Sequence, residues 1–487
     1  MKNRINYILN IIKQRIDIIL YAGLALVLYQ IGLGIVKQNY MILVLVIIFI
    51  ACLLVFLNKK KTFFLLILLI PFSFFLKLVL SLFLPGLLAS VIGIYKDLLL
   101  FSLLGSTMAV IITKKQYNFK LSRMYKPVLI FIALNVILFL TNSSSLIAGL
   151  IGFRKTIIFT FMFFLTGSLI KSKEDIKILV NIVLAVGFIL AIGAIIQWLF
   201  FPNLLHSATL ASGGLYGYDI SVSRAASFFQ SANVLGFYLA FLASVLIASI
   251  FMEKDKKQLI ICSVILMAFM VALLFTLSRG AWIAIVAGTA IWGIIKYKYL
   301  LKRAWLIVIV AVLAALMVLS SPLLMLRFQS IFDEEDISKQ SRFEKAFSVY
   351  AFKTDNMKDF LFGQGLGTTG AVPEALASED LKSGFIDFYY LELYNDIGII
   401  GLGCFLWVMC CYLKLLFITE RKTKDPYFKQ LINGFIIATF TFLFSGFFTG
   451  VGASFEEASV FWTFMGVTVI IYNKSLEGER HENPALN

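Results

Sequence analysis

Three arginines occur where apolar stretches of the sequence begin or end. Arg154 lies in "GFRKT", Arg224 in "VSRAASFFQSANVLG" and Arg279 in "TLSRGAW". Ionisable groups beside long apolar runs are costly and usually face a cavity or a partner. The guanidinium fork can contact two phosphate oxygens at once. These residues therefore predict a phosphate or pyrophosphate site, although anchoring at a membrane interface would explain any one of them alone.

Three carboxylates precede another apolar run, in the stretch "SGFIDFYYLELYNDIGIIGLGCFLWVM" that holds Asp387, Glu392 and Asp396. One of them could act as a general base that accepts a proton from a hydroxyl group. The alternatives are a favourable charge at a helix N-terminus and simple pairing with an arginine.

The residues after Arg224 indicate how a helix could add to the anion site. Asn233 is predicted to cap the helix of the next apolar run, and Gly236 allows another helix to approach closely. A helix N-terminus that points at an anion would reinforce the arginine charge. An ordinary transition from loop to helix is the alternative.

The elements that position these residues are predicted to be membrane helices. Of the 487 residues, 60% are hydrophobic and only 14% are charged, which lies well outside the usage of soluble proteins. Apolar runs of about twenty residues, enough to span a bilayer, recur along the chain. We expect an all-α polytopic membrane protein with about 12–14 transmembrane helices, the third of them interrupted by Pro71 and Lys77. The predicted spans are 16–36, 40–57, 62–84, 97–112, 127–141, 156–170, 177–200, 233–252, 258–276, 280–295, 304–320, 394–417, 431–449 and 458–472.

Lysine and arginine are concentrated in alternate loops, which predicts the orientation of the bundle. These loops include "NKKKT", "KSKEDIK", "EKDKKQ", "KYKYLLKR" and "ERKTKDPYFK". By the positive-inside rule they face the cytoplasm, together with both termini, and the three arginines then face outward. The net charge of +16 is thus a topology signal and does not indicate binding to nucleic acid.

Two outer loops are long, one at 201–232 and one from Ser321 to about 393. The second is predicted to contain a helix in "SRFEKAFSVYAFK", where Ser341 and Glu344 have the spacing of a capping box. The glycine-rich turn "FGQGLGTTG" follows it. The sequence shows neither a metal-ligand spacing nor a nucleotide motif, so we expect no metal and no cofactor. The expected divisions of the chain are N-terminal helices at 1–200, a core at 201–417, and C-terminal helices with a cytoplasmic tail at 418–487.

The order of these motifs over residues 215–415 resembles the O-antigen ligase and O-antigen polymerase superfamily. The shared features are "R…F…AN.LG", then "SRG", then "SRFEKAF" with "FGQGLGT", and finally "DFYYLELYNDIGIIGL". The resemblance implies a bundle like those of the membrane glycosyltransferases of type C, with a long extracytoplasmic loop between late helices. It also implies glycosyl transfer outside the cytoplasmic membrane, without a metal, from a glycan on undecaprenyl pyrophosphate.

The resemblance further implies roles for individual residues. Arg224 and Arg279 match the arginines that hold the pyrophosphate, and Arg342 matches an arginine at the start of the loop helix. Asp387 stands where the ligases carry a histidine that activates the acceptor. An aspartate at this place is what we expect of a polymerase. Arg154, Arg342 and Asn233 are expected to contribute to substrate binding.

The resulting hypothesis is a polymerase that joins lipid-linked oligosaccharide repeat units into a capsule, an exopolysaccharide, an O-antigen or a teichuronic-acid-type wall polymer. Its expected partners are the glycan donor and acceptor, the bilayer, a flippase and a chain-length regulator. The nearest alternative is a ligase that moves a finished glycan to a lipid, wall or protein acceptor. A transporter is the alternative from another class, but it predicts charges and broken helices at mid-membrane depth.

Overall fold

The described part of the chain is helical throughout. The computed structural model describes residues 40–83, 95–114, 124–142, 146–201, 224–253, 255–302, 316–330 apart from 317 and 320, 356–368, 388–448 and 454–482. Within these residues no β-strand occurs. The helices are α2 (Tyr40–Leu69), η1 (Ile70–Phe72), α3 (Ser73–Phe83), α5 (Tyr95–Lys114), α6 (Tyr125–Asn142), α7 (Leu146–Ile157), α8 (Thr160–Leu169), α9 (Lys173–Phe200), α11 (Ala232–Met252), α12 (Lys256–Phe275), α13 (Arg279–Ile295), α14 (Tyr297–Lys302), α16 (Pro322–Gln329), α18 (Met357–Phe362), α19 (Tyr389–Lys422), α20 (Pro426–Ser445) and α21 (Phe455–Glu482).

The length and composition of these helices confirm an all-α polytopic membrane protein. Eight stretches of the described helices are long and apolar enough to cross a membrane, or nine if α7 and α8 together form one bent span. Helix α13 is apolar but shorter. The predicted spans at 16–36 and 304–320 fall wholly or largely outside the described residues. Large apolar side chains such as Phe56, Leu140 and Ile294 face outward from the bundle, as contact with lipid requires.

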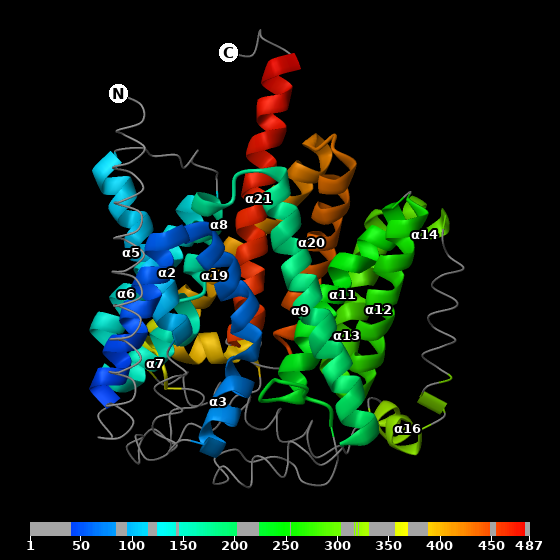
Figure 1. Cartoon of the computed structure of the whole chain (residues 1–487), viewed down its shortest axis with the longest axis horizontal. Coiled ribbons are helices and arrows are strands. Elements are labelled where there is room, and N and C mark those ends of the chain that lie inside the picture. The colour runs from blue at the N-terminus through cyan, green and yellow to red at the C-terminus, as the bar shows by residue number, and fades with distance from the viewer. Residues whose placement is uncertain are drawn as a thin grey trace, which may run out of the picture.

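Four of the basic loops predicted to share one side of the membrane meet at one end of the bundle, which we call the basic end. They are "NKKKT", "KSKEDIK", "KYKYLLKR" and "ERKTKDPYFK". Ion pairs join them there: Lys60 with Asp175 at 2.8 Å, Lys296 with Glu420 at 3.0 Å, Lys429 with Glu420 at 4.0 Å, and Lys173 with Asp425. Figure 1 shows α14 and the C-terminal part of α21 at this end, and α3 and α16 at the other. Burial raises the pKa of Asp425, but Lys173 and the amides of Phe428 and Tyr427 lower it more, so the pKa lies below its ordinary value.

Helix α11 lies at the centre of the bundle, against α12, α13, α20 and α21. Its central residues are almost completely buried, and buried polar pairs lie between the core helices around it. The Ser244 and Thr441 hydroxyls are 2.9 Å apart, and Trp292 Nε1 donates to Asn433 Oδ1 at 2.9 Å. Hydrogen bonds between helices help to hold a membrane bundle together, because lipid tails are as apolar as the helix surfaces and the hydrophobic effect does not drive the helices together.

Among the described residues, two helix breaks agree with the sequence, whereas the bend between α7 and α8 and the break at Gly398 inside α19 were not predicted. Backbone at Asn58 is non-helical inside α2, at the predicted loop between two spans, and Pro71 lies in the 3₁₀ turn η1 that separates α2 from α3. The predicted outer loop around Arg154 is wrong, because that segment is the helix α7, which meets α8 at a 47° bend. Gly149 and Gly152 are buried where α7 packs.

Candidate functional site

Arg224 is held by main-chain and side-chain acceptors at the end of the bundle opposite the basic end. Its Nε donates to the carbonyl oxygen of Thr276 at 2.9 Å, and its Nη2 donates to Asn233 Oδ1 at 2.6 Å. The amide of Ala225 donates to the carbonyl of Phe275 at 3.1 Å. The segment that carries Arg224 is thereby fixed against the turn between α12 and α13.

Asn233 therefore has a different role from the one predicted. The N-cap of α11 is Ser231, whose hydroxyl accepts from the amide of Asn233 at 3.2 Å. Asn233 is already helical, and its side chain orients the guanidinium of Arg224. The prediction misplaced the cap because Ser231 and Asn233 are both good capping residues two positions apart.

The segment after Arg224 is shaped by a glutamine of another helix. Gln197, near the end of α9, accepts through Oε1 from the amides of Ala226 at 3.0 Å and Ser227 at 2.8 Å. Ser227 has φ +52°, a conformation that is costly for a residue with a side chain. Strain of this kind is typical of segments that a fold holds for function.

Arg279 is the first residue of α13, directly after the turn that holds Arg224. Its Nη1 donates to Ser330 at the end of α16, at 2.9 Å to the carbonyl oxygen and at 2.8 Å to the hydroxyl. The turn packs tightly on α11, since a Cβ on Gly236 would lie 2.9 Å from the Cβ of Ser278. The close approach predicted for Gly236 is thus confirmed. The two arginines share one end of the bundle, which we call the arginine end.

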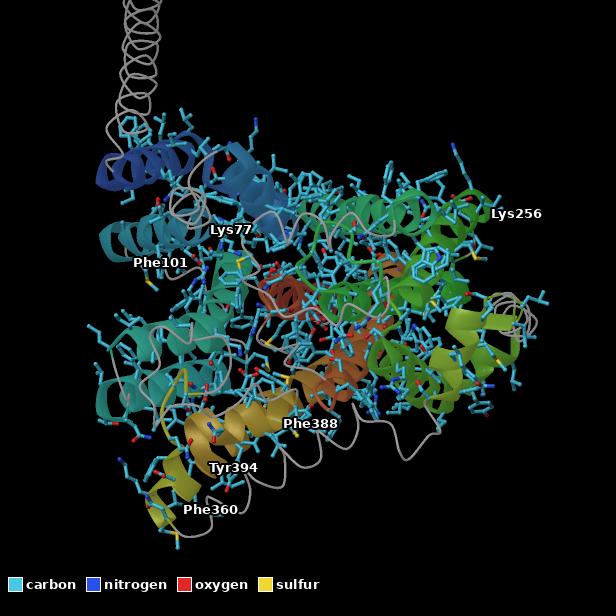
Figure 2. All side chains as sticks on the ribbon, turned by 90° about the horizontal axis from the view of Figure 1, so that it is seen from below. Lys77, Phe101, Lys256, Phe360, Phe388 and Tyr394 are labelled. Atoms are coloured by element: carbon cyan, nitrogen blue, oxygen red, sulfur yellow. The ribbon has the colours of Figure 1, made fainter. Side chains whose placement is uncertain are left out.

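The first residue of α19, where the long loop ends, also lies near the arginine end. The amide of Tyr389, the first residue of α19, donates to the carbonyl of Gly446 at 2.9 Å. Two residues on, Phe448 packs on α13 beside Arg279, where a Cβ on Gly280 would lie 2.5 Å from the Cβ of Phe448. Figure 2 shows Phe388 and Tyr394 along the start of α19, with Phe360 of α18 beside Tyr394. Asp387 and Arg342 lie outside the described residues.

The glycine-rich turn after α18 is clamped to α19 by Asp396. Asp396 is only 3% exposed. Its Oδ2 accepts from the amide of Gly367 at 3.3 Å, and its Oδ1 accepts from the Thr368 hydroxyl at 3.1 Å. The amides of Gln364 and Gly365 donate to the carbonyls of Asn395 and Asp396. Asp396 therefore positions the turn.

Glu392 is likewise engaged in the fold, because its carboxylate forms a buried ion pair with Lys155 of α7. Removal of one partner of such a pair leaves an uncompensated charge inside the protein. Of the three predicted acids, Glu392 and Asp396 thus have structural partners. The third, Asp387, lies outside the described residues.

Arg154 does not join Arg224 and Arg279. Its Nε and Nη2 both donate to Asp97 Oδ2 of α5, at 3.1 and 2.7 Å, and its guanidinium lies 4.4 Å from the ring centroid of Phe455. Nothing in the sequence spacing linked α5, α7 and α21, so the charged groups around Phe455 were not predicted as a set. What the sequence did show was acidic residues in the first turns of α5 and α21.

A group of three or more potential ligands for a metal ion does not occur in the described part of the chain. A comparison with curated proteins found no match. A family model described as O-antigen ligase matches residues 262–406. The match runs from α12 into α19, and it therefore contains Arg279 and the long loop, whereas Arg224 lies outside it, on the N-terminal side. The chain thus carries an O-antigen ligase-type domain at 262–406, and its resemblance to the O-antigen ligase and polymerase superfamily is confirmed.

Proposed function

We propose that this protein polymerises lipid-linked oligosaccharide repeat units at the outer face of the bacterial cytoplasmic membrane. The observation that carries the proposal is the arginine end, where the Arg224 side chain is bound to the short turn that Arg279 directly follows. Two fixed guanidinium groups suit a diphosphate at a membrane surface. The basic end then faces the cytoplasm.

In the proposed reaction, a hydroxyl of the acceptor glycan attacks the anomeric carbon of the donor. The bond between that carbon and the phosphate oxygen breaks, and undecaprenyl pyrophosphate leaves with the bonding electrons. Arg224 and Arg279 stabilise the charge that develops on the leaving group. Asp387 accepts or orients the proton of the attacking hydroxyl. The products are a glycan longer by the transferred chain and free undecaprenyl pyrophosphate.

A ligase is the second candidate, because the matched family is described as O-antigen ligase. Polymerisation is favoured by the aspartate at position 387, where the ligases are expected to carry a histidine. Transport is disfavoured, because it predicts charged groups at mid-membrane depth. The ion pairs Arg154–Asp97 and Lys155–Glu392 instead lie near the ends of their helices.

Loss of the protein distinguishes polymerase from ligase. We expect cells that lack it to accumulate single repeat units on the lipid carrier, because the joining step is missing. Gel separation of lipid-linked glycans gives the chain-length distribution, and re-expression of the wild-type chain should restore the ladder. Long chains that accumulate on the carrier would instead identify a ligase.

The Asp387→Asn variant tests the proposed proton acceptor. We expect the polymerisation rate to fall by about a hundredfold or more, because an amide cannot accept the proton of the acceptor hydroxyl. Asp387→His should retain activity, since imidazole is a proton acceptor near neutral pH. Asp359→Asn, on α18, is the matched control and should leave chain length unchanged. Wild-type chain length in the Asp387→Asn variant would exclude this role.

A further inference from the structure

A second set of cations surrounds one aromatic ring, away from Arg224 and Arg279. Lys96 Nζ lies 3.8 Å from the centroid of the Phe455 ring, and Arg154 Cζ lies 4.4 Å from the same centroid. The two cations are therefore separated by no more than the sum of these distances. They come from α5 and α7, and the ring belongs to the first residue of α21.

These cations retain donors that the fold does not use. Among the described residues, Lys96 Nζ has neither an ion pair nor a hydrogen bond, and it lies against the face of the Phe455 ring. Arg154 spends two donors on one oxygen of Asp97, while Nη1 has no described acceptor. The side chain of Arg154 is 41% exposed, against 9% for Asp97. Its free edge can therefore receive a ligand.

The local charges leave room for an anion. Asp97 pairs with Arg154, and Glu456 and Asp97 both act electrostatically on Lys96 without forming an ion pair with it in the described part of the chain. Glu456 also acts on Arg154. Lys77 of α3 adds a further positive charge near Lys96. Cations held over the face of an aromatic ring are stabilised by it yet keep their hydrogen-bond donors. An oxyanion that accepts from both Lys96 and Arg154 would use the donors that remain.

The position of this set relative to the arginine end suggests which anion it binds. The segment that joins α20 to α21 has Phe448 at one end, packed beside Arg279, and Phe455 at the other. Phe455 is seven positions after Phe448 in the sequence, so these two points lie no more than about 25 Å apart. A polymerase must hold two lipid diphosphates at once, one on the donor and one on the acceptor. The acceptor's diphosphate is one repeat unit away from the hydroxyl that attacks.

We propose that Lys96 and Arg154, over the Phe455 ring, bind the diphosphate of a second lipid-linked substrate, the acceptor. This inference rests on the proposed function, because only a polymerase needs two lipid diphosphates. A ligase that acts on a different kind of acceptor has no use for a second site of this kind. Lys96 and Arg154 here bind substrate and take no part in bond making.

The test is the number of prenyl diphosphate sites on the full-length protein in lipid nanodiscs, with geranylgeranyl diphosphate as the probe. We expect two sites on the wild-type chain and one on Lys96→Gln, with affinity at the altered site weaker by about tenfold or more. Lys96→Arg should keep both sites, which separates loss of charge from loss of fold. Lys358→Gln removes an exposed cation of α18 and should also keep both.

The outcomes separate this inference from the proposed function. One site on the wild-type chain, or two on Lys96→Gln, would overturn the second site. Two sites on Arg279→Gln would instead overturn the assignment of the donor diphosphate and leave the second site intact. Equal binding of inorganic pyrophosphate at the Lys96 site would show that it takes a free phosphate and not a lipid.

Discussion

The Arg279→Ala variant should abolish long polysaccharide chains while the protein still accumulates in the membrane. Loss of one preorganised group that stabilises developing charge typically costs a factor of about a hundred to a thousand in rate. Here the group is proposed to face a leaving diphosphate, whose charge rises as the glycosidic bond breaks. Chain length on a glycan gel, with protein level by immunoblot, measures both effects.

The fold should tolerate this change, because Arg279 is poorly placed to stabilise its own helix. A cation in the first turn opposes the helix dipole at a cost of about 0.3–1 kcal/mol, and alanine is the best helix former. Against this, the variant loses the bonds to Ser330. Arg279→Lys should recover part of the activity, since it restores charge without the fork. Arg421→Ala, at the basic end, is the matched control, and undiminished chains in Arg279→Ala would refute the role.

The Gly367→Ala variant should lower the melting temperature more than any other glycine-to-alanine substitution discussed here. Gly367 has φ +80°, and a Cβ there would lie 2.0 Å from the carbonyl oxygen of Ala148 in α7. For a residue with a side chain, the left-handed conformation alone costs about 1–2 kcal/mol. The new Cβ would also clash with main-chain atoms, which cannot rotate away as a side chain can. The contact is mutual, since a Cβ on Gly152 would lie 2.2 Å from the Gly367 amide nitrogen.

Thermal unfolding in detergent and the yield of monodisperse protein measure this effect. Gly403→Ala in α19 is the control, because no atom lies within 4 Å of a Cβ at that position and alanine favours helix. We expect Gly367→Ala to melt at a lower temperature and to reduce chain length, because the turn holds α19 through Asp396. Equal melting of the two variants would show that α7 and the turn are not packed as described.

The sequence predicted what depends on local pattern. Apolar runs identified the spans, lysine and arginine distribution identified the basic end, and Pro71 identified an interrupted helix. It could not predict what depends on contacts between distant segments. The pairing of Lys155 with Glu392 joins residues 237 positions apart, and nothing near either residue indicates the other. Likewise, position 152 needs a residue without a side chain because the main chain of Gly367 packs against it, and that contact is between distant segments.

The site was predictable to the same extent. The arginines stood out by residue type beside apolar runs, and Arg224 is bound to the turn that Arg279 directly follows. Arg154 has the same signature but is held by Asp97 of a helix more than fifty residues earlier. To distinguish Arg154 from the other two arginines, one must know which helices are neighbours, and a single sequence does not contain that information.

The bond from the Tyr389 amide to the Gly446 carbonyl has a consequence for how this protein can diversify. Both groups belong to the main chain, so a change of side chain at either position leaves the bond in place. Only proline at position 389 would remove the donor. The chain that precedes Phe388 can therefore change in length and sequence while the start of α19 stays anchored.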